Sequence, residues 1–151
     1  MTPTMTNSSN ATDQTSVLVS VAWVHQQSNK ILCVRTQGQD RFFIPGGKPE
    51  QGESLPEALV REVHEELGVR LRPETIQPLT VIQGPAYGRP HCTLLMHCFV
   101  AEPETVDFSA HAEIAELVWV DQHNKSLCAP AAIQLIDELA MFDTHNSDSI
   151  F

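Results

Sequence analysis

Residues 47–69 read GKPEQGESLPEALVREVHEELGV, and the charge pattern within this stretch is the most informative feature of the chain. Glu62, Glu65 and Glu66 fall on one side of a short predicted helix, and Arg61 stands beside them. Like charges three or four residues apart on a helix repel each other and destabilise it. Such a concentration of carboxylates is typical of a segment that holds a cation.

The two ends of this helix are marked in the sequence. Ser54 and Glu57 have the spacing of a capping box, in which each side chain bonds the backbone N–H of the other residue. Gly68 stands where a left-handed residue closes a helix. Between these ends, apolar residues recur at every fourth position: Leu55, Leu59, Val63 and Leu67. The sequence therefore predicts an amphipathic helix that packs one face into the core and presents carboxylates on another.

A double glycine precedes the helix. Gly46 and Gly47 permit unusual backbone angles and a close approach of a ligand, so a backbone carbonyl of this turn can join the carboxylates around a cation. Oxygen ligands of this kind suit Mg²⁺ or Mn²⁺. Such an ion neutralises diphosphate oxygens and lowers the pKa of bound water. The residues therefore predict the attack of water on a phosphorus atom.

The same stretch resembles the Nudix box. It contains Gly, five residues, Glu, seven residues, Arg-Glu, an aliphatic residue, any residue, Glu-Glu, any residue, Gly and an aliphatic residue. A run of glutamates on a helix is usually a solvated face, and that interpretation would suffice for any two of these residues. It does not explain the whole pattern, because seven fixed residues at frequencies of about 5–7% each would match by chance roughly once in a billion starting positions. The chain is therefore identified as a member of the Nudix hydrolases, and it is similar to the small MutT-like proteins.

This resemblance implies an α/β fold, the Nudix fold, in which a mixed β-sheet is sandwiched between α-helices and the box forms a loop, a helix and a loop. We expect the Nudix domain to span residues 16–143. A disordered tail over 1–15 and a polar tail over 144–151 are expected to flank it, because both segments are poor in apolar residues.

The remaining elements are predicted from apolar runs and turn residues. Strands are expected at 17–24, 31–35, 42–44, 79–83, 93–101 and 117–120, and a second helix is expected at 129–142. The first two strands are expected to form a hairpin. The sequence Pro45-Gly46-Gly47 is expected to break regular structure.

The resemblance also implies a metal site that holds Mg²⁺ or Mn²⁺. Gly46, through its carbonyl oxygen, Glu62 and Glu66 would be metal ligands. Glu65 would share the metal ions or the water that bridges them. The number of metal ions and the identity of the general base stay open, because both differ among members of the family.

Further catalytic residues are implied around this site. Arg61 would hold a glutamate in place through a bidentate ion pair, and Glu53 would be a further carboxylate near the metal. Several members of the family also use a carboxylate from a later loop. Glu113 and Glu116 are the candidates in this chain, and Glu113 is preferred.

Four residues are candidates for contact with the substrate. Arg35 and Arg41 flank the turn before the box, where they would either touch phosphates or keep the surface soluble. Tyr87 and Arg89 lie in the predicted loop 84–91, which would border the substrate pocket or form an exposed turn.

The resemblance implies a pyrophosphohydrolase that acts on a nucleoside diphosphate linked to another group. An ordinary or modified nucleoside triphosphate is the expected substrate, giving a monophosphate and pyrophosphate. ADP-ribose, dinucleoside polyphosphates and other diphosphate conjugates are alternatives, because the fold and box do not decide the substrate. A domain that senses a nucleotide without hydrolysing it ranks lower, since the box is intact.

The bulk composition narrows the expected partners and location. Nine basic and nineteen acidic side chains give a net charge of −10, which argues against binding of long nucleic acid through a basic face. No apolar run is long enough to span a membrane, and the N-terminus lacks the pattern of a signal peptide. The four cysteines form no CxxC pair and are expected to be reduced thiols of a cytoplasmic protein. The sequence carries no signal for the oligomeric state.

Overall fold

The computed structural model describes the backbone of residues 16–150 and the side chains as far as Met141. The expected tail over 1–15 lies outside these residues. In chain order the elements are β1 (Ser16–Trp23), β2 (Gln26–Gln27), β3 (Lys30–Thr36), β4 (Gly46–Gly47), α2 (Leu55–Leu67), η1 (Pro73–Thr75), β5 (Gln77–Pro85), β6 (Cys92–Val100), β7 (Ile114–Val120), η2 (Lys125–Leu127) and α3 (Pro130–Ile150).

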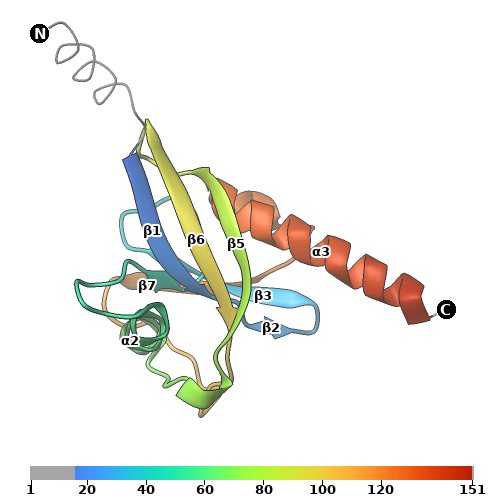
Figure 1. Ribbon diagram of the computed structural model, residues 1–151, viewed down its shortest axis with the longest axis horizontal. Helices are drawn as coiled ribbons and strands as arrows, with labels where there is room; N and C mark the ends of the chain where they lie inside the picture. The colour runs from blue at the N-terminus through green and yellow to red at the C-terminus, as the bar shows by residue number, and fades with distance from the viewer. Residues whose placement is uncertain (1–15, 151) are drawn as a thin grey trace, which may run out of the picture.

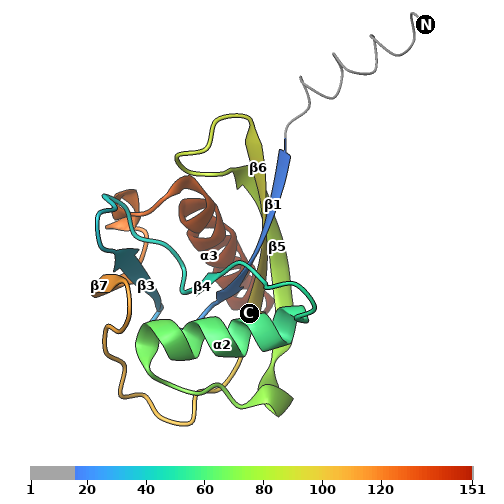
Figure 2. The same ribbon diagram turned by 90° about the vertical axis from the view of Figure 1, so that its left-hand side faces the viewer.

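The strands form two sheets between two helices. One sheet has the order β4-β1-β6-β5 and is mixed, because β1 runs parallel to β6 while the other neighbours are antiparallel (Figure 1). The other sheet has the order β2-β3-β7 and is antiparallel. Helices α2 and α3 lie on opposite sides of the mixed sheet (Figure 2). This arrangement confirms the predicted α/β fold with mixed β-structure between helices.

The C-terminal end of strand β1, Val21–Trp23, is buried on both faces, which explains its continuous apolar sequence. Val21 and Trp23 point to one side and pack in the cluster that contains Leu59 of α2. Ala22 points to the other side and packs in the cluster that contains Leu135 of α3. Successive side chains of a strand point to opposite faces, so β1 separates two hydrophobic cores, one under each helix.

The capping of α2 matches its sequence signals. The N–H of Glu57 donates to Ser54 Oγ at 3.2 Å, and the N–H of Ser54 donates to Glu57 Oε1 at 2.9 Å, which completes the capping box. Gly68 closes the helix with a left-handed φ of 73°. Leu59, Val63 and Leu67 are buried, so the predicted apolar stripe is confirmed.

The expected hairpin between the first two strands is wrong. Strands β1 and β3 lie in different sheets, and β3 instead pairs with β2 and β7. A two-residue turn at Ser28 and Asn29, with φ values of 54° and 65°, joins β2 to β3. Positive φ at both turn positions matches the twist of adjacent antiparallel strands, so the hairpin forms one strand later than expected.

Two expectations around the double glycine also need correction. Residues 46 and 47 do not break regular structure but form β4, which pairs with Val21 and Ala22 of β1. The expected strand at 42–44 is reduced to isolated bridges, in which Phe42 pairs with Cys128 and Phe43 pairs with Val34. The glycines can pair here because they lack side chains that would collide with their neighbours.

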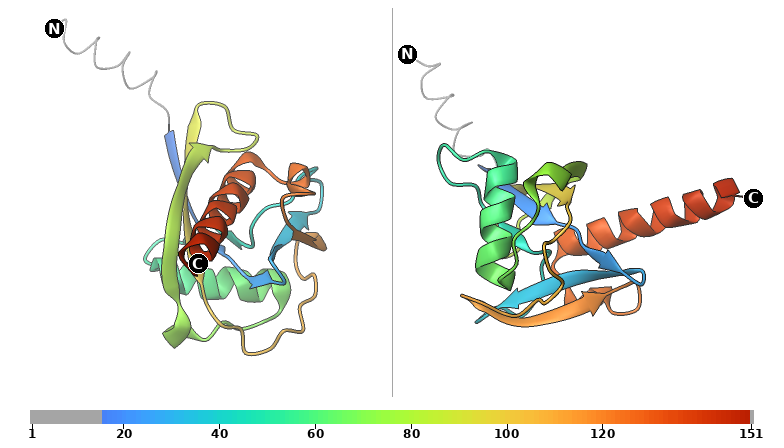
Figure 3. Two further views of the ribbon diagram at one scale, coloured as in Figure 1. Left: turned by 90° about the vertical axis from the view of Figure 1, so that its right-hand side faces the viewer. Right: turned by 90° about the horizontal axis from the view of Figure 1, so that it is seen from below.

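The last helix is longer than expected. The backbone of α3 stays helical to Ile150, whereas we expected it to give way to a polar tail soon after Phe142 (Figure 3). Residues 143–150 contain no Gly or Pro, so polarity alone does not end the helix. Within residues 16–150, no helix combines the length and apolar character needed to cross a membrane.

Candidate active site

The turn at β4 depends on the absence of a side chain at Gly46. Its φ is 152°, and a Cβ atom at this position would overlap the carbonyl oxygen of Val21. The N–H of Gly46 donates to Glu66 Oε1 at 3.1 Å. Because glycine allows β4 to lie this close to β1, the backbone of the turn reaches a carboxylate of α2.

Gly47 has a different neighbour. A Cβ atom here would overlap the carboxyl group of Glu62, whose three atoms are its nearest neighbours. The two glycines therefore bring one short strand against two carboxylates on the same face of α2, Glu62 and Glu66.

Arg61 makes a bidentate pair with Glu53. Its Nε donates to Glu53 Oε2 at 2.7 Å and its Nη2 to Glu53 Oε1 at 2.9 Å. These bonds, together with one from the N–H of Glu50, lower the pKa of Glu53 to about 2. Nη2 also donates to the carbonyl oxygen of Lys48 at 3.2 Å, so Arg61 ties the loop before the helix to the helix itself.

The remaining nitrogen of Arg61 faces the other carboxylates. Nη1 lies 3.2 Å from Glu62 Oε2 and 3.4 Å from Glu65 Oε1. The Glu62 side chain is 17% exposed and that of Glu65 is 52% exposed. Burial raises the pKa of Glu62, and the charge of Arg61 opposes this effect. Arg61 is thus the counter-ion of the cluster.

Glu66 is a partly buried carboxylate that accepts one hydrogen bond, from the N–H of Gly46. Burial raises its pKa to about 8, and the N–H of Gly46 offsets only part of that effect. The negative charges of Glu62, Glu65 and Glu113 raise the pKa further.

The loop between β6 and β7 carries the later carboxylate. The N–H of Ser109 donates to Leu67 O at 3.3 Å and the N–H of His111 donates to Glu66 O at 3.0 Å, so the loop covers the C-terminal end of α2. This places Glu113 near enough for its charge to act on Glu66.

Glu116 faces another partner. Its Oε1 accepts bonds from Nε and Nη2 of Arg35 at 3.0 Å and 2.8 Å, across the β3–β7 pair. Of the two later candidates, the structure therefore directs Glu113 toward the cluster and Glu116 toward Arg35.

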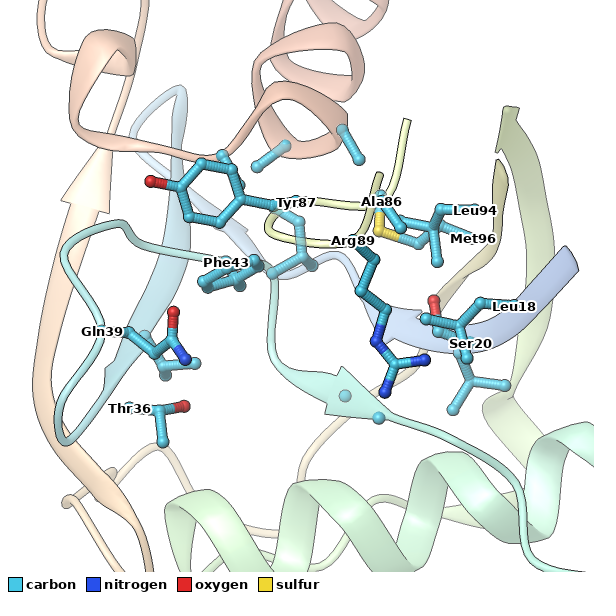
Figure 4. A pocket seen from close by; sticks show the side chains of 18 of the residues that line it. Leu18, Ser20, Thr36, Gln39, Phe43, Ala86, Tyr87, Arg89, Leu94 and Met96 are labelled. Atoms are coloured by element: carbon cyan, nitrogen blue, oxygen red, sulfur yellow. The ribbon is translucent and has the colours of Figure 1, made fainter. Parts of the chain in front are cut away.

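A cavity of about 320 Å³ opens beside the carboxylate cluster (Figure 4). Gly46, Gly47 and Glu66 form part of its wall, and most of the remaining wall is apolar. Tyr87 and Arg89 also line the cavity.

The other two substrate candidates do not line this cavity. Arg35 is paired with Glu116, and its Nη1 donates to Gln39 O at 3.1 Å. Arg41 donates from Nη1 to Ser126 O at 2.7 Å. Both arginines therefore hold loops in place near the site rather than facing into it.

Several residues of the cavity wall were not predicted from the sequence. Phe43 contributes an aromatic ring, and Ala131 and Ala132 at the start of α3 close one side of the cavity. Phe43 stands close to the double glycine, which was a usable local signal. The alanines carried no such signal, because only the tertiary fold brings the start of α3 to the cavity.

The donor atoms at the cluster fit a hard divalent cation. Glu62, Glu65 and Glu66 offer carboxylate oxygens, and Gly46 offers a backbone carbonyl oxygen. Within residues 16–141, no three Asp, Glu, His or Cys side chains already converge as a metal-binding group. Arg61 contacts Glu62 and Glu65 through one bond each, whereas it holds Glu53 through two.

A mixed sheet between two helices, with an acidic helix packed on a double glycine, defines the architecture of a Nudix domain. The model of the NUDIX domain family matches residues 15–135 of this chain. The chain belongs to the Nudix family and is a MutT-like member of it.

Solved structures agree with this assignment. The solution structure of the E. coli ORF135 protein is similar, with a TM-score of 0.66 and 28% identity over 85% of this chain and 92% of that one. A NUDIX hydrolase from Nitrosomonas europaea has a TM-score of 0.67 and 22% identity over 83% of this chain and 90% of that one, which shows the shared fold.

Curated relatives match shorter stretches. The 8-oxo-(d)GTP phosphatase of Mycolicibacterium smegmatis is 30% identical over 101 residues, which cover 64% of this chain and 28% of that protein. The human 8-oxo-dGDP phosphatase NUDT18 is 32% identical over 74 residues, 48% of this chain and 23% of that protein. The RNA pyrophosphohydrolase of Shewanella piezotolerans is 42% identical over 53 residues, 35% of this chain and 30% of that protein. The matches thus span less than a third of each of these three relatives.

Proposed function

We propose that the protein hydrolyses the diphosphate linkage of a nucleoside diphosphate joined to another group, with Mg²⁺ or Mn²⁺ as cofactor. The preferred substrate is an ordinary or modified nucleoside triphosphate, which would yield a monophosphate and pyrophosphate. One observation carries this proposal: Glu66 belongs both to the carboxylate cluster of α2 and to the wall of the cavity. A substrate in the cavity would therefore have its phosphates beside the metal ligands.

The cluster residues divide into ligands and supports. Glu62, Glu66 and the Gly46 carbonyl would hold the metal, and Glu65 would share it or orient water. When bound, the ion supplies charge neutralisation and a water of lowered pKa. Arg61 and Glu53 act as positioning residues, because Glu53 uses both its oxygens on Arg61.

A carboxylate near the ligands would accept the proton of the attacking water. Glu65 is half exposed, and Glu113 is exposed on the loop that covers the end of α2, so both have freedom to reach a water molecule. Neither carboxylate lies in the bidentate pair that occupies Glu53. We therefore expect either Glu65 or Glu113 to be the general base.

The relatives support the reaction class. Two of them are named as phosphatases of oxidised guanine nucleotides, and a third is named as an RNA pyrophosphohydrolase. All three names describe hydrolysis at a nucleotide phosphate. The net charge of −10 disfavours a long RNA, so we prefer a free nucleotide for this chain.

Glutamine substitution at Glu66 tests the proposal. Glutamine is nearly isosteric with glutamate and keeps an oxygen to accept the N–H of Gly46, so Glu66→Gln is expected to fold. The variant loses a charged metal ligand, and we expect kcat to fall by about a hundredfold or more. Glu74→Gln is the matched control, because Glu74 is exposed on η1, away from the cluster.

The assay uses a panel of nucleoside triphosphates, 8-oxo-dGTP, ADP-ribose and a short 5′-triphosphorylated RNA, with and without Mg²⁺. Phosphate is counted after pyrophosphatase or phosphatase is added. Turnover of any panel member that needs the metal and is lost in Glu66→Gln supports the proposal. Binding of nucleotides without release of phosphate from any of them would instead favour a nucleotide sensor.

A further inference from the structure

The cavity has two oppositely charged side chains and is otherwise neutral. Among the described residues that line it, Glu66 is the one carboxylate and Arg89 is the one cation. A Glu66 engaged with a divalent ion would leave Arg89 as the remaining charged group on the cavity wall. In that state, no acidic side chain on the cavity wall would neutralise the charge of Arg89.

Arg89 is also free of protein partners. Within the described part of the chain, its guanidinium makes no hydrogen bond or ion pair. Arg35, Arg41 and Arg61 differ, because each donates to a carboxylate or a carbonyl oxygen. Five N–H donors in a planar fork are thus available to a ligand with several acceptor oxygens.

The loop that carries Arg89 is held over the cavity. Tyr87 donates from its hydroxyl to Asp40 Oδ1 at 2.8 Å, and its ring meets that of Phe43 edge-on with centroids 6.0 Å apart. The N–H of Arg89 donates to Ala86 O at 3.1 Å and closes the turn. These contacts fix the backbone from which the side chain of Arg89 extends.

The labelled side chains divide the cavity into two ends (Figure 4). Phe43 and Tyr87 stand at one end, where aromatic faces suit a planar ring. Arg89 extends from the β5–β6 loop into the cavity away from these two rings. Gly46 and Gly47 of β4 also line this cavity.

We propose that Arg89 binds an anionic group beyond the scissile diphosphate and thereby makes the cavity select nucleoside triphosphates over diphosphates that end in a neutral group. This inference rests on the proposed function, which places the scissile diphosphate beside Gly46 and Glu66. A base packed against the Phe43 and Tyr87 rings would then direct the distal phosphate toward Arg89. A neutral sugar at that position would leave the guanidinium without a partner.

The test compares two substrate classes in the Arg89→Ala variant. We expect the ratio of kcat/KM for a nucleoside triphosphate to kcat/KM for a nucleoside diphosphate sugar to fall roughly ten- to hundredfold, the usual weight of a hydrogen bond to a charged group. The loss is expected in KM rather than in kcat. Arg89→Lys should recover part of the ratio, because it keeps the charge without the fork.

Arg70→Ala is the matched control, because it removes the same charge from an exposed position outside the cavity. It is expected to leave the ratio unchanged. An equal fall for both substrate classes in Arg89→Ala, or no change in either, would overturn the inference.

Binding separates this inference from the proposed function. Calorimetry with Mg²⁺ and a non-hydrolysable nucleoside triphosphate analogue needs no turnover. We expect the wild type to bind the triphosphate analogue more tightly than the matching diphosphate analogue, and Arg89→Ala to abolish that difference. Equal affinities in the wild type would refute the role of Arg89 even if hydrolysis is observed.

Discussion

Gly46 and Gly47 are neighbours in sequence, but each meets a different obstacle. A side chain on Gly46 would collide with the backbone of β1, which cannot give way without loss of the strand pair. A side chain on Gly47 would collide with the carboxyl end of Glu62, which is flexible. The first glycine therefore supports the fold, and the second supports the position of a proposed metal ligand.

Alanine substitutions should separate these two roles. Gly46→Ala is expected to lower the free energy of unfolding by about 2–4 kcal/mol, through backbone strain and displacement of β4. Gly47→Ala is expected to lower the free energy of unfolding by less than about 1 kcal/mol. It is expected to raise the Mg²⁺ concentration that gives half-maximal activity by about tenfold or more. Urea unfolding and a magnesium titration of turnover measure the two effects. Equal losses of stability in both variants would disprove the distinction.

His25 is a residue whose protonation opposes folding. Its Nε2 is buried and has no hydrogen-bond partner among the described residues, and its ring stacks on Trp23 at 4.6 Å. Burial lowers the pKa of His25 below its usual value of 6.5, so folding favours the neutral ring. Below pH 6.5 the unfolded chain binds the proton more readily, so stability is lost as the pH falls.

This linkage predicts the pH dependence of a variant. His25→Phe keeps an aromatic ring and removes the titration, so its loss of stability between about pH 7 and pH 5 should be smaller than that of the wild type. Chemical denaturation at the two pH values measures the difference. The exposed position His64 supplies the control, and His64→Phe should keep the wild-type pH dependence. If His25→Phe loses as much stability between these two pH values as the wild type, His25 is not the source of the pH dependence.

At the scale of the element, the position and the ends of α2 could be predicted from its own sequence, because the residues that determine them lie within or next to the helix. The capping box, the apolar stripe and the terminal glycine act within thirteen helical residues and their immediate neighbours. The acidic face was readable for the same reason. The helix therefore carries the part of the site that a sequence can predict.

Removal of the cap should weaken this element. Ser54→Ala deletes the oxygen that accepts the N–H of Glu57, and we expect the free energy of unfolding to fall by about 1 kcal/mol. Ser54→Thr keeps a hydroxyl and should lose only a few tenths of that value. Thermal and urea denaturation report both changes. Full stability in Ser54→Ala would show that tertiary contacts alone hold the start of α2.

The pairing of strands that are distant in the sequence could not be predicted from the sequence. Strand β1 pairs in parallel with β6, with Ser16 opposite Cys92. No local sequence pattern predicts a pairing between strands so far apart in the chain. The error about the first hairpin follows from this, since adjacency in sequence suggested β3 instead. The length of α3 was missed for another reason, because polar residues without Gly or Pro do not stop a helix.

At the scale of the whole molecule, the candidate site is assembled from both kinds of information. The carboxylates come from one helix, and they were predicted from a contiguous stretch of sequence. The cavity needs β1, β3, the β5–β6 loop and the start of α3, so its lining appeared only with the fold. Phe43 and Ala131 were therefore unrecognised, although Tyr87 and Arg89 were already candidates.

The central claim is that the carboxylates of α2 hold a divalent ion at which water attacks a phosphorus atom of a nucleotide diphosphate linkage. Hydrolysis of the best panel substrate in oxygen-18 water, followed by mass spectrometry of both products, tests it most directly. We expect one labelled oxygen in one of the two phosphate-containing products, only with Mg²⁺ or Mn²⁺, and formed at least about a hundredfold more slowly by Glu66→Gln. Metal-independent turnover, or labelled product from Glu66→Gln at the wild-type rate, would contradict it.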